Sequence, residues 1–232
     1  MTKKTLVVLT GAGISAESGI KTFRDYDGLW ENYRIEEVAT AEAWRKNPTL
    51  VMEFYNQRRR QLKEVNPNRA HLKLVELEKF FDVQIITQNV DDLHERAGST
   101  NILHLHGSLL SKCSSYDKSK YRTYVDGDMK LDEKAPDGSI YRPDIVWFGE
   151  DVPMFEKAIE ISERADVFLI VGTSLQVYPA ANLVSYTKPN TPVYVIDKKI
   201  PFFHGKDFIA IEESAGKGME IFFSQIMELT GN

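Results

Sequence analysis

Short apolar runs recur along the chain and alternate with longer amphipathic segments. The apolar runs predict buried strands at residues 5–9, 83–87, 102–105, 167–171, 193–196 and 208–211. Helix-compatible spacing of apolar residues predicts helices at residues 69–80, 154–165 and 219–229. Strands that alternate with helices indicate an α/β fold, in which a parallel sheet carries helices on both faces. We therefore expect a ligand site at the carboxyl ends of the strands.

The first apolar run leads into the glycine-containing segment Gly11-Ala12-Gly13-Ile14-Ser15-Ala16. Glycines at 11 and 13 allow a sharp turn and a close approach to a ligand, and Ala16 lets the following helix pack near the strand. The N–H groups exposed at such a helix start can bind a pyrophosphate. A simple glycine turn has the same pattern, so the residues after the later strands must decide between the two interpretations.

Two segments interrupt the alternation of strands and helices. Residues 21–66 favour helix, with Asn47 as the cap of a helix that starts at Pro48 and runs to about Val65. Residues 111–143 are polar and contain turn signals at 126–127 and 137–138. We expect these two segments to form a small inserted lobe. The main domain would then consist of residues 1–20, 67–110 and 144–232.

Composition and charge narrow the class of protein. The chain has 232 residues, a net charge of −5 and one cysteine. The acidic balance argues against a nucleic-acid partner, and the run Arg58-Arg59-Arg60 is typical of a solvated helix face. A single cysteine excludes an internal disulfide and fits a reducing compartment. Because no apolar stretch near the N-terminus is long enough for a signal sequence or a membrane span, we expect a cytoplasmic protein without membrane contact.

Polar residues follow the predicted strand at 83–87 in the order Gln88-Asn89-Val90-Asp91-Asp92. This position, just past a parallel strand, is where a cofactor would bind. Asn89 or Asp91 could equally be the N-cap of the helix that leads toward Gly98. Spacing alone leaves both interpretations open.

The next predicted strand leads into His104-Leu105-His106-Gly107. Two histidines two positions apart on a strand face the same side, so alternation does not choose between them. His106 stands at the strand end before a glycine and is the better exposed candidate for a base near neutral pH. A structural histidine is the alternative for either position.

Two further strand ends carry candidate ligand-binding residues. Gly172-Thr173-Ser174 follows the strand at 167–171 and could supply further phosphate donors. Asp197 follows the strand at 193–196, where a carboxylate can accept from a ribose diol and would repel a 2′-phosphate. This favours NAD over NADP. A capping or surface aspartate is the alternative.

Taken in order, these motifs resemble those of the sirtuins, which are NAD-dependent protein-lysine deacylases. The resemblance covers nearly the whole chain. It is carried by residues 11–20, Thr22-Phe23-Arg24, 88–91, 104–107, Trp147-Phe148-Gly149-Glu150 and 172–174. It implies a Rossmann-like NAD-binding main domain and NAD as the cofactor.

The resemblance also assigns roles to individual residues. Catalysis would rest on His106, Asn89 and Asp91: His106 would be the base on a ribose hydroxyl after the acyl-lysine oxygen attacks the anomeric carbon and nicotinamide leaves. Cofactor binding would involve Gly11, Ala12, Gly13, Glu17, Phe23, Arg24, Gln88, Asn89, Asp91, Gly172, Thr173, Ser174, Asp197 and Ala215. The product would be an O-acyl-ADP-ribose.

The protein substrate would be an acylated lysine in an extended peptide. By resemblance it would add as a strand between Phe148-Gly149-Glu150 and a loop at 174–178 that contains Val177. Gly149 would permit the close approach. We expect the enzyme to be a monomer.

A tyrosine and an arginine three positions apart concern the choice of acyl group. Tyr55 and Arg58 share a helix face, and the pair resembles that of class III sirtuins, which remove succinyl and malonyl groups. The arginine would pair with the distal carboxylate. Spacing also allows Arg59, at i+4 from Tyr55, or a plain solvated face. Some deacetylation is expected to remain.

The sequence departs from the family pattern at three places. Most sirtuins bind a structural zinc through two Cys-x-x-Cys pairs, but here the first pair reads Cys113-Ser114-Ser115-Tyr116 and no cysteine follows. We therefore expect no metal, and expect the lobe to pack instead through Tyr116, Tyr121, Tyr124 and Tyr141. Asp197 replaces the usual asparagine. From the short ends of the chain we expect no targeting or regulatory tail.

Several alternatives to an acidic-acyl deacylase stay open. These are a general lysine deacetylase, a weakly catalytic NAD or ADP-ribose sensor, and a mono-ADP-ribosyl transferase. An ordinary Rossmann dehydrogenase fits less well, because residues 88–91 and His106 suit glycosidic cleavage better.

Overall fold

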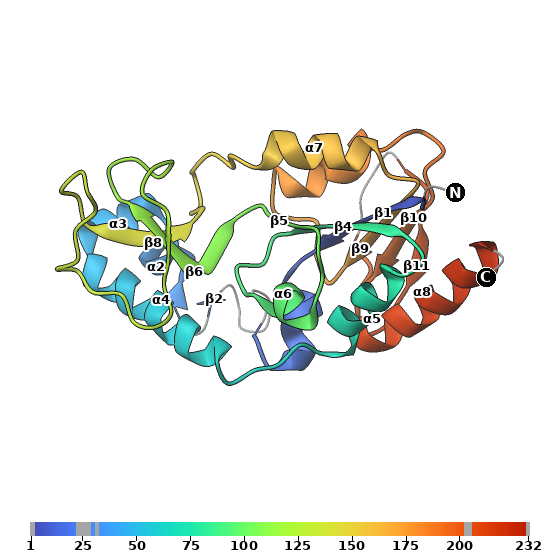
Figure 1. Cartoon of the computed structure of the whole chain (residues 1–232), viewed down its shortest axis with the longest axis horizontal. Coiled ribbons are helices and arrows are strands. Elements are labelled where there is room, and N and C mark those ends of the chain that lie inside the picture. Colours follow the sequence, from blue (N-terminus) through green and yellow to red (C-terminus); the bar gives the residue numbers. More distant parts are fainter. Residues whose placement is uncertain (1–2, 22–28, 31–32, 202–205, 231–232) are drawn as a thin grey trace.

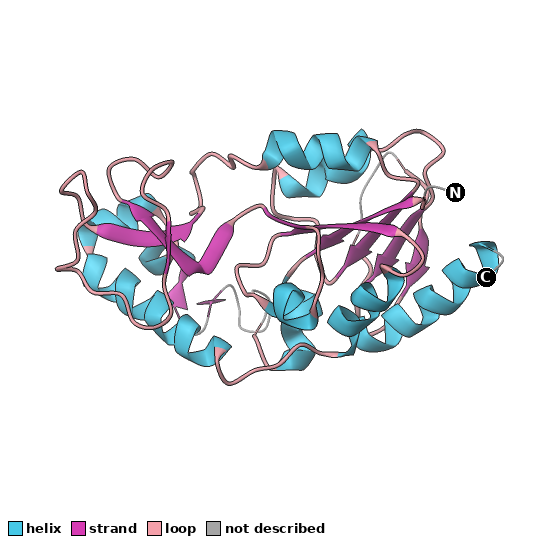
Figure 2. Ribbon diagram, viewed as in Figure 1, coloured by secondary structure: helices cyan, strands magenta, loops and turns pink. Residues whose placement is uncertain are grey.

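The computed structural model describes residues 3–21, 29–30, 33–201 and 206–230. Its elements form two parts that lie side by side along the longest axis (Figure 1). One part contains a parallel sheet with helices on both faces, and both ends of the chain lie at its outer end. The other part contains short helices and a small antiparallel sheet (Figure 2). The predicted α/β class is confirmed.

The large sheet has six parallel strands in the order β11-β10-β9-β1-β4-β5. They are β1 (Thr5–Thr10), β4 (Asp82–Thr87), β5 (Ile102–His104), β9 (Val167–Val171), β10 (Val193–Ile196) and β11 (Ile209–Ile211). The first strand lies in the middle, paired with β4 on one side and β9 on the other. The next strands in sequence, β4 and β5, lie on one side of β1, and the later strands β9, β10 and β11 lie on its other side. Open α/β sheets bind ligands at the carboxyl end of the strand where the order switches sides in this way.

Helices cover both faces of this sheet. They are α5 (Arg69–Leu77), α7 (Phe155–Glu163), η2 (Ala180–Tyr186) and α8 (Ala215–Thr230). Alternate residues of β1 enter different cores: Leu6 and Val8 pack on the α5 and α8 side, and Val7 and Leu9 on the α7 and η2 side. Burial on both faces explains why these strands read as continuous apolar runs.

Short helices follow two of the central strands. They are α1 (Ala12–Ser15) with η1 (Ala16–Ser18) after β1, and α6 (Leu93–Ala97) after β4. The predicted helix at 219–229 begins earlier, at Ala215, although Gly216 and Gly218 are poor helix formers. Gly218 is required by packing, because a Cβ there would lie 2.2 Å from Ile196 Cγ2.

The second part is formed by one segment that precedes β5 in sequence and one that follows it. Its elements are β2 (Leu29–Trp30), β3 (Tyr33–Arg34), α2 (Ile35–Val38), α3 (Ala41–Lys46), α4 (Pro48–Leu62), β6 (Gly107–Ser114), β7 (Thr123–Tyr124) and β8 (Tyr141–Ile145). Asn47 caps α4 as predicted, since its side chain accepts a hydrogen bond from the Leu50 N–H at 3.0 Å. The predicted lobe boundaries at 110/111 and 143/144 fall inside β6 and β8.

Of the four tyrosines predicted to hold this lobe together, three do not pack in it, and the fourth, Tyr141, is partly buried with Lys112 Nζ 4.6 Å from its ring centre. Tyr116, Tyr121 and Tyr124 are 87, 41 and 67% exposed. The lobe instead has an apolar core that includes Val38, Phe54, Tyr55, Leu109 and Trp147. The prediction was wrong because the polar segment contributes few buried residues, and the apolar contacts come from α2, α4 and the ends of β6 and β8. No helix in the described part of the chain is long and apolar enough to cross a membrane.

Candidate active site

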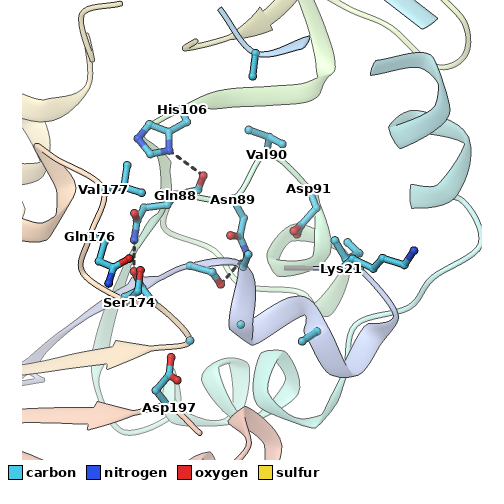
Figure 3. A pocket seen from close by; sticks show the side chains of 18 of the residues that line it. Lys21, Gln88, Asn89, Val90, Asp91, His106, Ser174, Gln176, Val177 and Asp197 are labelled. Carbon is cyan, nitrogen blue, oxygen red and sulfur yellow. Dashed lines mark hydrogen bonds between the residues drawn. The ribbon is translucent and has the colours of Figure 1, made fainter. Parts of the chain in front are cut away.

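A cavity of about 660 Å³ lies between the two parts, at the carboxyl ends of β1, β4, β9 and β10. Residues from many separate segments face this one space (Figure 3). Its lining includes the following predicted site residues: Gly11, Ala12, Gly13, Glu17, Tyr55, Gln88, Asn89, Asp91, His106, Phe148, Gly149, Glu150, Gly172, Thr173, Ser174, Val177, Asp197 and Ala215. Phe23 and Arg24 lie outside the described residues.

The glycines of the first loop are also required for close packing against the loop after β9. A Cβ on Gly11 would lie 2.7 Å from Thr173 Cβ, and one on Gly13 would lie 2.6 Å from Gly172 Cα. The Gly13 N–H donates to the Gly172 carbonyl at 2.8 Å, so it already has a partner within the protein. Gly172 has φ +63° and a Cβ there would lie 2.3 Å from Ile14 N. The loops after β1 and β9 therefore pack backbone to backbone and together form one wall of the cavity.

Ser15 joins this wall to the polar residues after β4. Its buried hydroxyl donates to Asp91 Oδ2 at 3.0 Å and accepts from Asn89 Nδ2 at 3.1 Å. Asn89 Nδ2 also donates to the Gly11 carbonyl at 3.2 Å. These contacts hold Asn89 and Asp91 in fixed positions beside the glycine loop. Sequence reasoning missed Ser15, although it lies within the first motif, because its role depends on a strand that follows more than seventy residues later.

The prediction that Asn89 or Asp91 is the N-cap of α6 was wrong, because the N-cap of α6 is Asp92. Asp91 lies one residue earlier and still contacts the first turn. Its Oδ1 accepts from the Leu93 N–H at 3.1 Å at the start of α6, while the residue also lines the cavity. Burial raises the pKa of this carboxyl to about 6, against the lowering effect of the Leu93 and Ser15 hydrogen bonds. A carboxyl with a pKa raised toward neutrality, facing a cavity, is typical of a functional site.

The two histidines that spacing could not separate have different surroundings. His104 is bonded on both ring nitrogens, Nδ1 to the Asn89 carbonyl at 3.0 Å and Nε2 to Glu95 at 2.7 Å. Burial opposes its charged form, but the hydrogen bond and the charge of Glu95 outweigh burial and raise its pKa. His104 is therefore an ion-paired structural histidine.

His106 lines the cavity, and its Nδ1 is hydrogen-bonded to the Gln88 carbonyl at 3.0 Å (Figure 3). A carbonyl can only accept, so Nδ1 carries the proton and Nε2 keeps its lone pair. Burial lowers the pKa of His106 and so keeps the ring neutral near pH 7. This tautomer and protonation state are the ones a general base requires.

The far end of the cavity is formed by residues after β10 and at the start of α8. Asp197 lies there, and its Oδ1 accepts from the Lys199 N–H at 3.0 Å. Glu17 accepts from the Gly216 N–H at 3.0 Å and so links η1 to the first turn of α8 beside Ala215. Gln88 Nε2 donates to Thr173 Oγ1 at 3.0 Å and links the loops after β4 and β9.

The segment after β8 lies on the opposite side of the cavity. Phe148 is 45% exposed, and its N–H donates to the Ala39 carbonyl at 3.0 Å. Gly149 has φ +83°, and a Cβ added to it would meet no atom of the described residues within 4 Å, so an incoming chain has space beside it. Glu150 is bound to Arg142 at 2.8 and 3.1 Å, and its Oε2 accepts from the Trp147 N–H at 2.9 Å. The Glu150 carboxylate thus fixes the turn from within the protein.

The two residues predicted to select the acyl group line two adjoining cavities. Tyr55 lines the large one, and Arg58 lines an adjoining cavity of about 40 Å³ that shares Ile20, Lys21, Val90 and Asp91 with it. The guanidinium of Arg58 lies 4.9 Å from the centre of the Phe54 ring.

The alternative arginine, Arg59, is fully buried and binds the protein itself. It donates to the Gly127 and Leu109 carbonyls at 3.0 and 3.2 Å and also to Asn56. Arg59 is therefore a structural residue of the lobe.

The surroundings of Cys113 bear on the predicted absence of a structural zinc site. Cys113 is buried, and burial raises the pKa of its thiol to about 12. Within the described ranges no three histidine, cysteine, aspartate or glutamate side chains come together as metal ligands. Next to Cys113, the Ser114 hydroxyl joins β6 to the loop before β8, because it contacts Asp137 at 2.5 Å and Ser139 at 3.0 Å.

Comparisons with known proteins agree with this architecture. The sequence model of the Sir2 family matches residues 11–179. An NAD-dependent protein deacylase of Helicobacter pylori is 54% identical over 97% of this chain and 99% of its own length. One of Bacteroides thetaiotaomicron is 52% identical over 94% of this chain and 95% of its own length.

Solved structures of Sir2 proteins also superpose on nearly the whole chain. A Sir2 homolog–NAD complex superposes with a TM-score of 0.84 at 39% identity, over 98% of this chain and 91% of that one. A complex of Sir2 with a p53 peptide and NAD+ superposes with a TM-score of 0.75 at 28% identity, over 99% and 94% of the two chains. With a family match over most of its length and relatives above 50% identity, the chain belongs to the Sir2, or sirtuin, family.

Proposed function

We propose that this protein is an NAD-dependent protein-lysine deacylase that favours succinyl and malonyl groups and retains some deacetylation. The observation that carries the proposal is the convergence on one cavity of the glycine loops, residues 88–91, His106 and the segment at Phe148. The relatives named as NAD-dependent protein deacylases support the coarser part of the proposal. The acyl preference rests on Tyr55 and Arg58.

The residues of the cavity fit a dinucleotide. Small residues form the wall at Gly11, Ala12 and Gly172, and Asp197 lies beyond them at the end of β10. The volume lies in the usual range for cofactor sites. Asp197 would accept from a ribose diol, and Asn89 and Asp91 would orient the part of the ligand nearest His106. NAD would supply the ribosyl group that receives the acyl group, with nicotinamide as the leaving group.

In this proposal His106 is the general base. Its Nε2 lone pair would accept a proton from a ribose hydroxyl, while the Gln88 carbonyl holds the ring in the required tautomer. Because the pKa of His106 is lowered, the acid limb of kcat/KM should lie below pH 6.5. Activity should be full above that limb and fall as His106 becomes protonated.

An acyl-lysine peptide would lie beside Phe148 and Gly149, where the chain leaves space for another backbone. The acyl group would extend toward Tyr55, and a distal carboxylate would reach Arg58 in the adjoining cavity. Arginine binds carboxylates with paired hydrogen bonds, which gives both charge and geometric selectivity.

We also propose that the enzyme works as a cytoplasmic monomer and that its lobe is stable without zinc. In place of a metal, hydrogen bonds of Ser114 and of the buried Arg59 would hold the loops of the lobe together. Metal analysis of purified protein should find far less than one zinc per chain. Near-stoichiometric zinc would contradict this part of the proposal.

The deciding experiment compares acetyl-lysine and succinyl-lysine peptides of one sequence, incubated with and without NAD and followed by mass spectrometry. We expect NAD-dependent loss of both groups, faster for succinyl, with nicotinamide and acyl-ADP-ribose as products. Loss of acetyl alone would contradict the acyl preference. Binding of NAD without turnover would favour the sensor alternative, and modified protein in place of free acyl-ADP-ribose would favour ADP-ribosyl transfer.

Two variants and a matched control test the assigned residues. His106→Asn should lower turnover of both peptides by about 10²- to 10⁴-fold, the usual contribution of a general base. Arg58→Met should lower succinyl turnover selectively. Arg60→Met is the control, because Arg60 lies on the same helix, is about half exposed and pairs with Asp128 at 2.7 Å.

A further inference from the structure

Two histidines at the end of β5 bind two consecutive carbonyls of the segment after β4. His106 Nδ1 is hydrogen-bonded to the Gln88 carbonyl (Figure 3), and His104 Nδ1 to the Asn89 carbonyl, each at 3.0 Å. The rings differ at their second nitrogen. His106 lines the cavity, whereas His104 Nε2 lies 2.7 Å from Glu95 Oε1 of α6. His104 therefore joins α6 to the residue whose side chain lies beside the glycine loop.

The two acceptors around His104 require a doubly protonated ring. A backbone carbonyl and an ionised carboxylate can only accept hydrogen bonds, so both ring nitrogens must donate. Burial raises the pKa of the Glu95 carboxyl, but the hydrogen bond and the charge of His104 outweigh burial and lower it. The pKa of His104 is raised in turn. The structure therefore favours an imidazolium paired with a carboxylate.

The peptide that His104 holds belongs to a residue fixed at its other polar groups. The Asn89 N–H donates to Thr87 Oγ1 at 3.0 Å, and the Asn89 side-chain amide donates to the Gly11 carbonyl and the Ser15 hydroxyl. Asn89 is 8% exposed and lines the cavity. The His104 contact fixes the carbonyl side of this backbone, and with it the direction in which Asn89 faces the cavity.

Loss of one proton from His104 would leave a single N–H group for two acceptors. The exposed lone pair would then face either the Glu95 carboxylate or the Asn89 carbonyl and repel it. Hydrogen bonds to an ionised acceptor are the stronger kind. The neutral ring should therefore keep its contact with Glu95 and release the Asn89 carbonyl.

On the basis of the proposed function, we propose that His104 and Glu95 form a positioning pair, which holds Asn89 in its cavity-facing conformation while the His104 ring is doubly protonated and releases it when the ring becomes neutral. His104 acts through Asn89 and not on the reacting atoms. The pair would give kcat/KM an alkaline limb, in addition to the acid limb that belongs to His106.

The groups around His104 keep their charge in the range of this alkaline limb. Those that face it are Glu95 and His94 of α6 and Asp91 of the segment after β4. Burial raises the pKa of Asp91 to about 6 and lowers that of His94 to about 3. Above about pH 7, Asp91 is therefore ionised and His94 is neutral, as is His106 with its lowered pKa. His104 is the group among these that changes charge there.

Two substitutions separate the two contacts of His104. The amide nitrogen of asparagine is bonded to Cγ, like Nδ1 of histidine, and that of glutamine lies farther out, like Nε2. His104→Asn should keep a donor on the Asn89 carbonyl at every pH, so activity should persist and the alkaline limb should vanish. His104→Gln should keep a donor to Glu95 alone. Its kcat/KM for an acetyl-lysine peptide should fall about 10- to 100-fold, as for loss of a hydrogen bond from a charged donor.

Steady-state kinetics over a pH series measures both variants beside the wild type. Equal losses in His104→Asn and His104→Gln would overturn the proposal, because a merely structural histidine predicts no difference between them. An alkaline limb that survives in His104→Asn would overturn it as well.

Glu95→Gln tests the pair without changing the ring. It removes the carboxylate charge, so the pKa of His104 should fall and the alkaline limb should move to lower pH. Glu163→Gln is the matched control, since Glu163 is an exposed glutamate of α7, and it should leave the limb in place. If the His104 variants do not fold, this comparison decides: an alkaline limb that does not move in Glu95→Gln would overturn the proposal.

A measurement without substrate separates this inference from the function on which it rests. NMR titration of the free protein follows the His104 ring and the Val90 amide, which belongs to the peptide whose carbonyl His104 binds. Both should titrate together in the wild type, and the Val90 response should be absent in His104→Asn. That result without turnover of either acyl peptide would overturn the deacylase proposal alone. Turnover with a Val90 amide that does not respond to His104 would overturn this inference alone.

Discussion

The sheet region and the small lobe bury polar side chains of different kinds. Between the sheet and its helices, a cluster of neutral polar side chains is buried: His71, His94, Thr10 and Thr87 lie there, with Thr10 Oγ1 bonded to Thr87 at 2.8 Å and to His94 at 3.1 Å. In the lobe, two arginines are buried beside the neutral Asn56 and Ser114. Arg59 is fully buried and Arg142 is 5% exposed on its side chain.

The difference follows from how each region satisfies its backbone. The parallel sheet pairs its own N–H and C=O groups in regular ladders, so few side chains need to bond them. The lobe contains short strands and loops, whose carbonyls need donors from side chains. A guanidinium has five donors in a fixed geometry and can join several such carbonyls at once. In the lobe, arginine side chains therefore supply the hydrogen bonds to backbone carbonyls that strand pairing supplies in the sheet.

The largest difference we expect is at low pH, which should destabilise the sheet region more than the lobe. Burial lowers the pKa of His71 to about 4 and of His94 to about 3. Both bind protons more readily when the chain unfolds, so stability should be full above about pH 6.5 and fall as pH drops toward 4, by on the order of 2 kcal/mol for each histidine. In the lobe, burial lowers the pKa of Arg59 to about 10, still far above this range, so Arg59 stays charged throughout it. Denaturant unfolding over a pH series measures the effect, and His71→Gln should flatten the curve. An unchanged slope in that variant would contradict the explanation.

Gly172→Ala should destabilise the sheet region by about 3 kcal/mol. Part of the cost is the left-handed backbone at φ +63°, and part is the contact of the new Cβ with Ile14 N at 2.3 Å. Gly138→Ala is the matched control, since Gly138 has φ +82° and its added Cβ would have no described atom within 4 Å. It should lose only the conformational part, about 1 kcal/mol. Equal losses in the two variants would show that the loop contact is not tight.

Arg59→Met should destabilise the lobe by about 2 kcal/mol, because it leaves the Gly127 and Leu109 carbonyls without their donor. Arg60→Met removes two exposed ion pairs, with Glu53 and Asp128, from the same helix and should cost less than about 1 kcal/mol. Denaturant unfolding of both variants measures the difference. If the two substitutions cost the same, guanidinium bonding is not what holds the lobe loops.

Ser114→Ala should have the smallest effect, about 1 kcal/mol. The hydroxyl contacts Asp137 and accepts from the Tyr116 and Asp117 N–H groups at 3.1 and 3.0 Å. Ser185→Ala, which removes an exposed hydroxyl bonded to the Asn182 carbonyl, is the control. Hydrogen exchange of the amides at 116 and 117 should accelerate in Ser114→Ala alone, and unchanged exchange would argue against a bracing role.

Much of the main domain could be predicted from local pattern. The strands at 167–171 and 193–196 match the observed ones, and the others differ by one residue at an end. The start of α8 was placed too late, because Gly216 and Gly218 weaken helix propensity and the close packing of Gly218 against Ile196 is a tertiary property. Three of the four lobe tyrosines were misjudged for a related reason: aromatic content does not specify which side chains find apolar neighbours.

By itself, the sequence determined the order of strands and helices, the positions of the glycine turns and the set of polar residues at strand ends. These depend on short-range periodicity and backbone sterics, which residues close together in the sequence specify. Only the tertiary structure decided which histidine has a lone pair facing the cavity, that Arg59 is structural, that Ser15 joins Asn89 to Asp91, and that Trp147 donates to Tyr55. Each of these depends on a hydrogen bond between segments far apart in sequence, and no local pattern specifies such a bond.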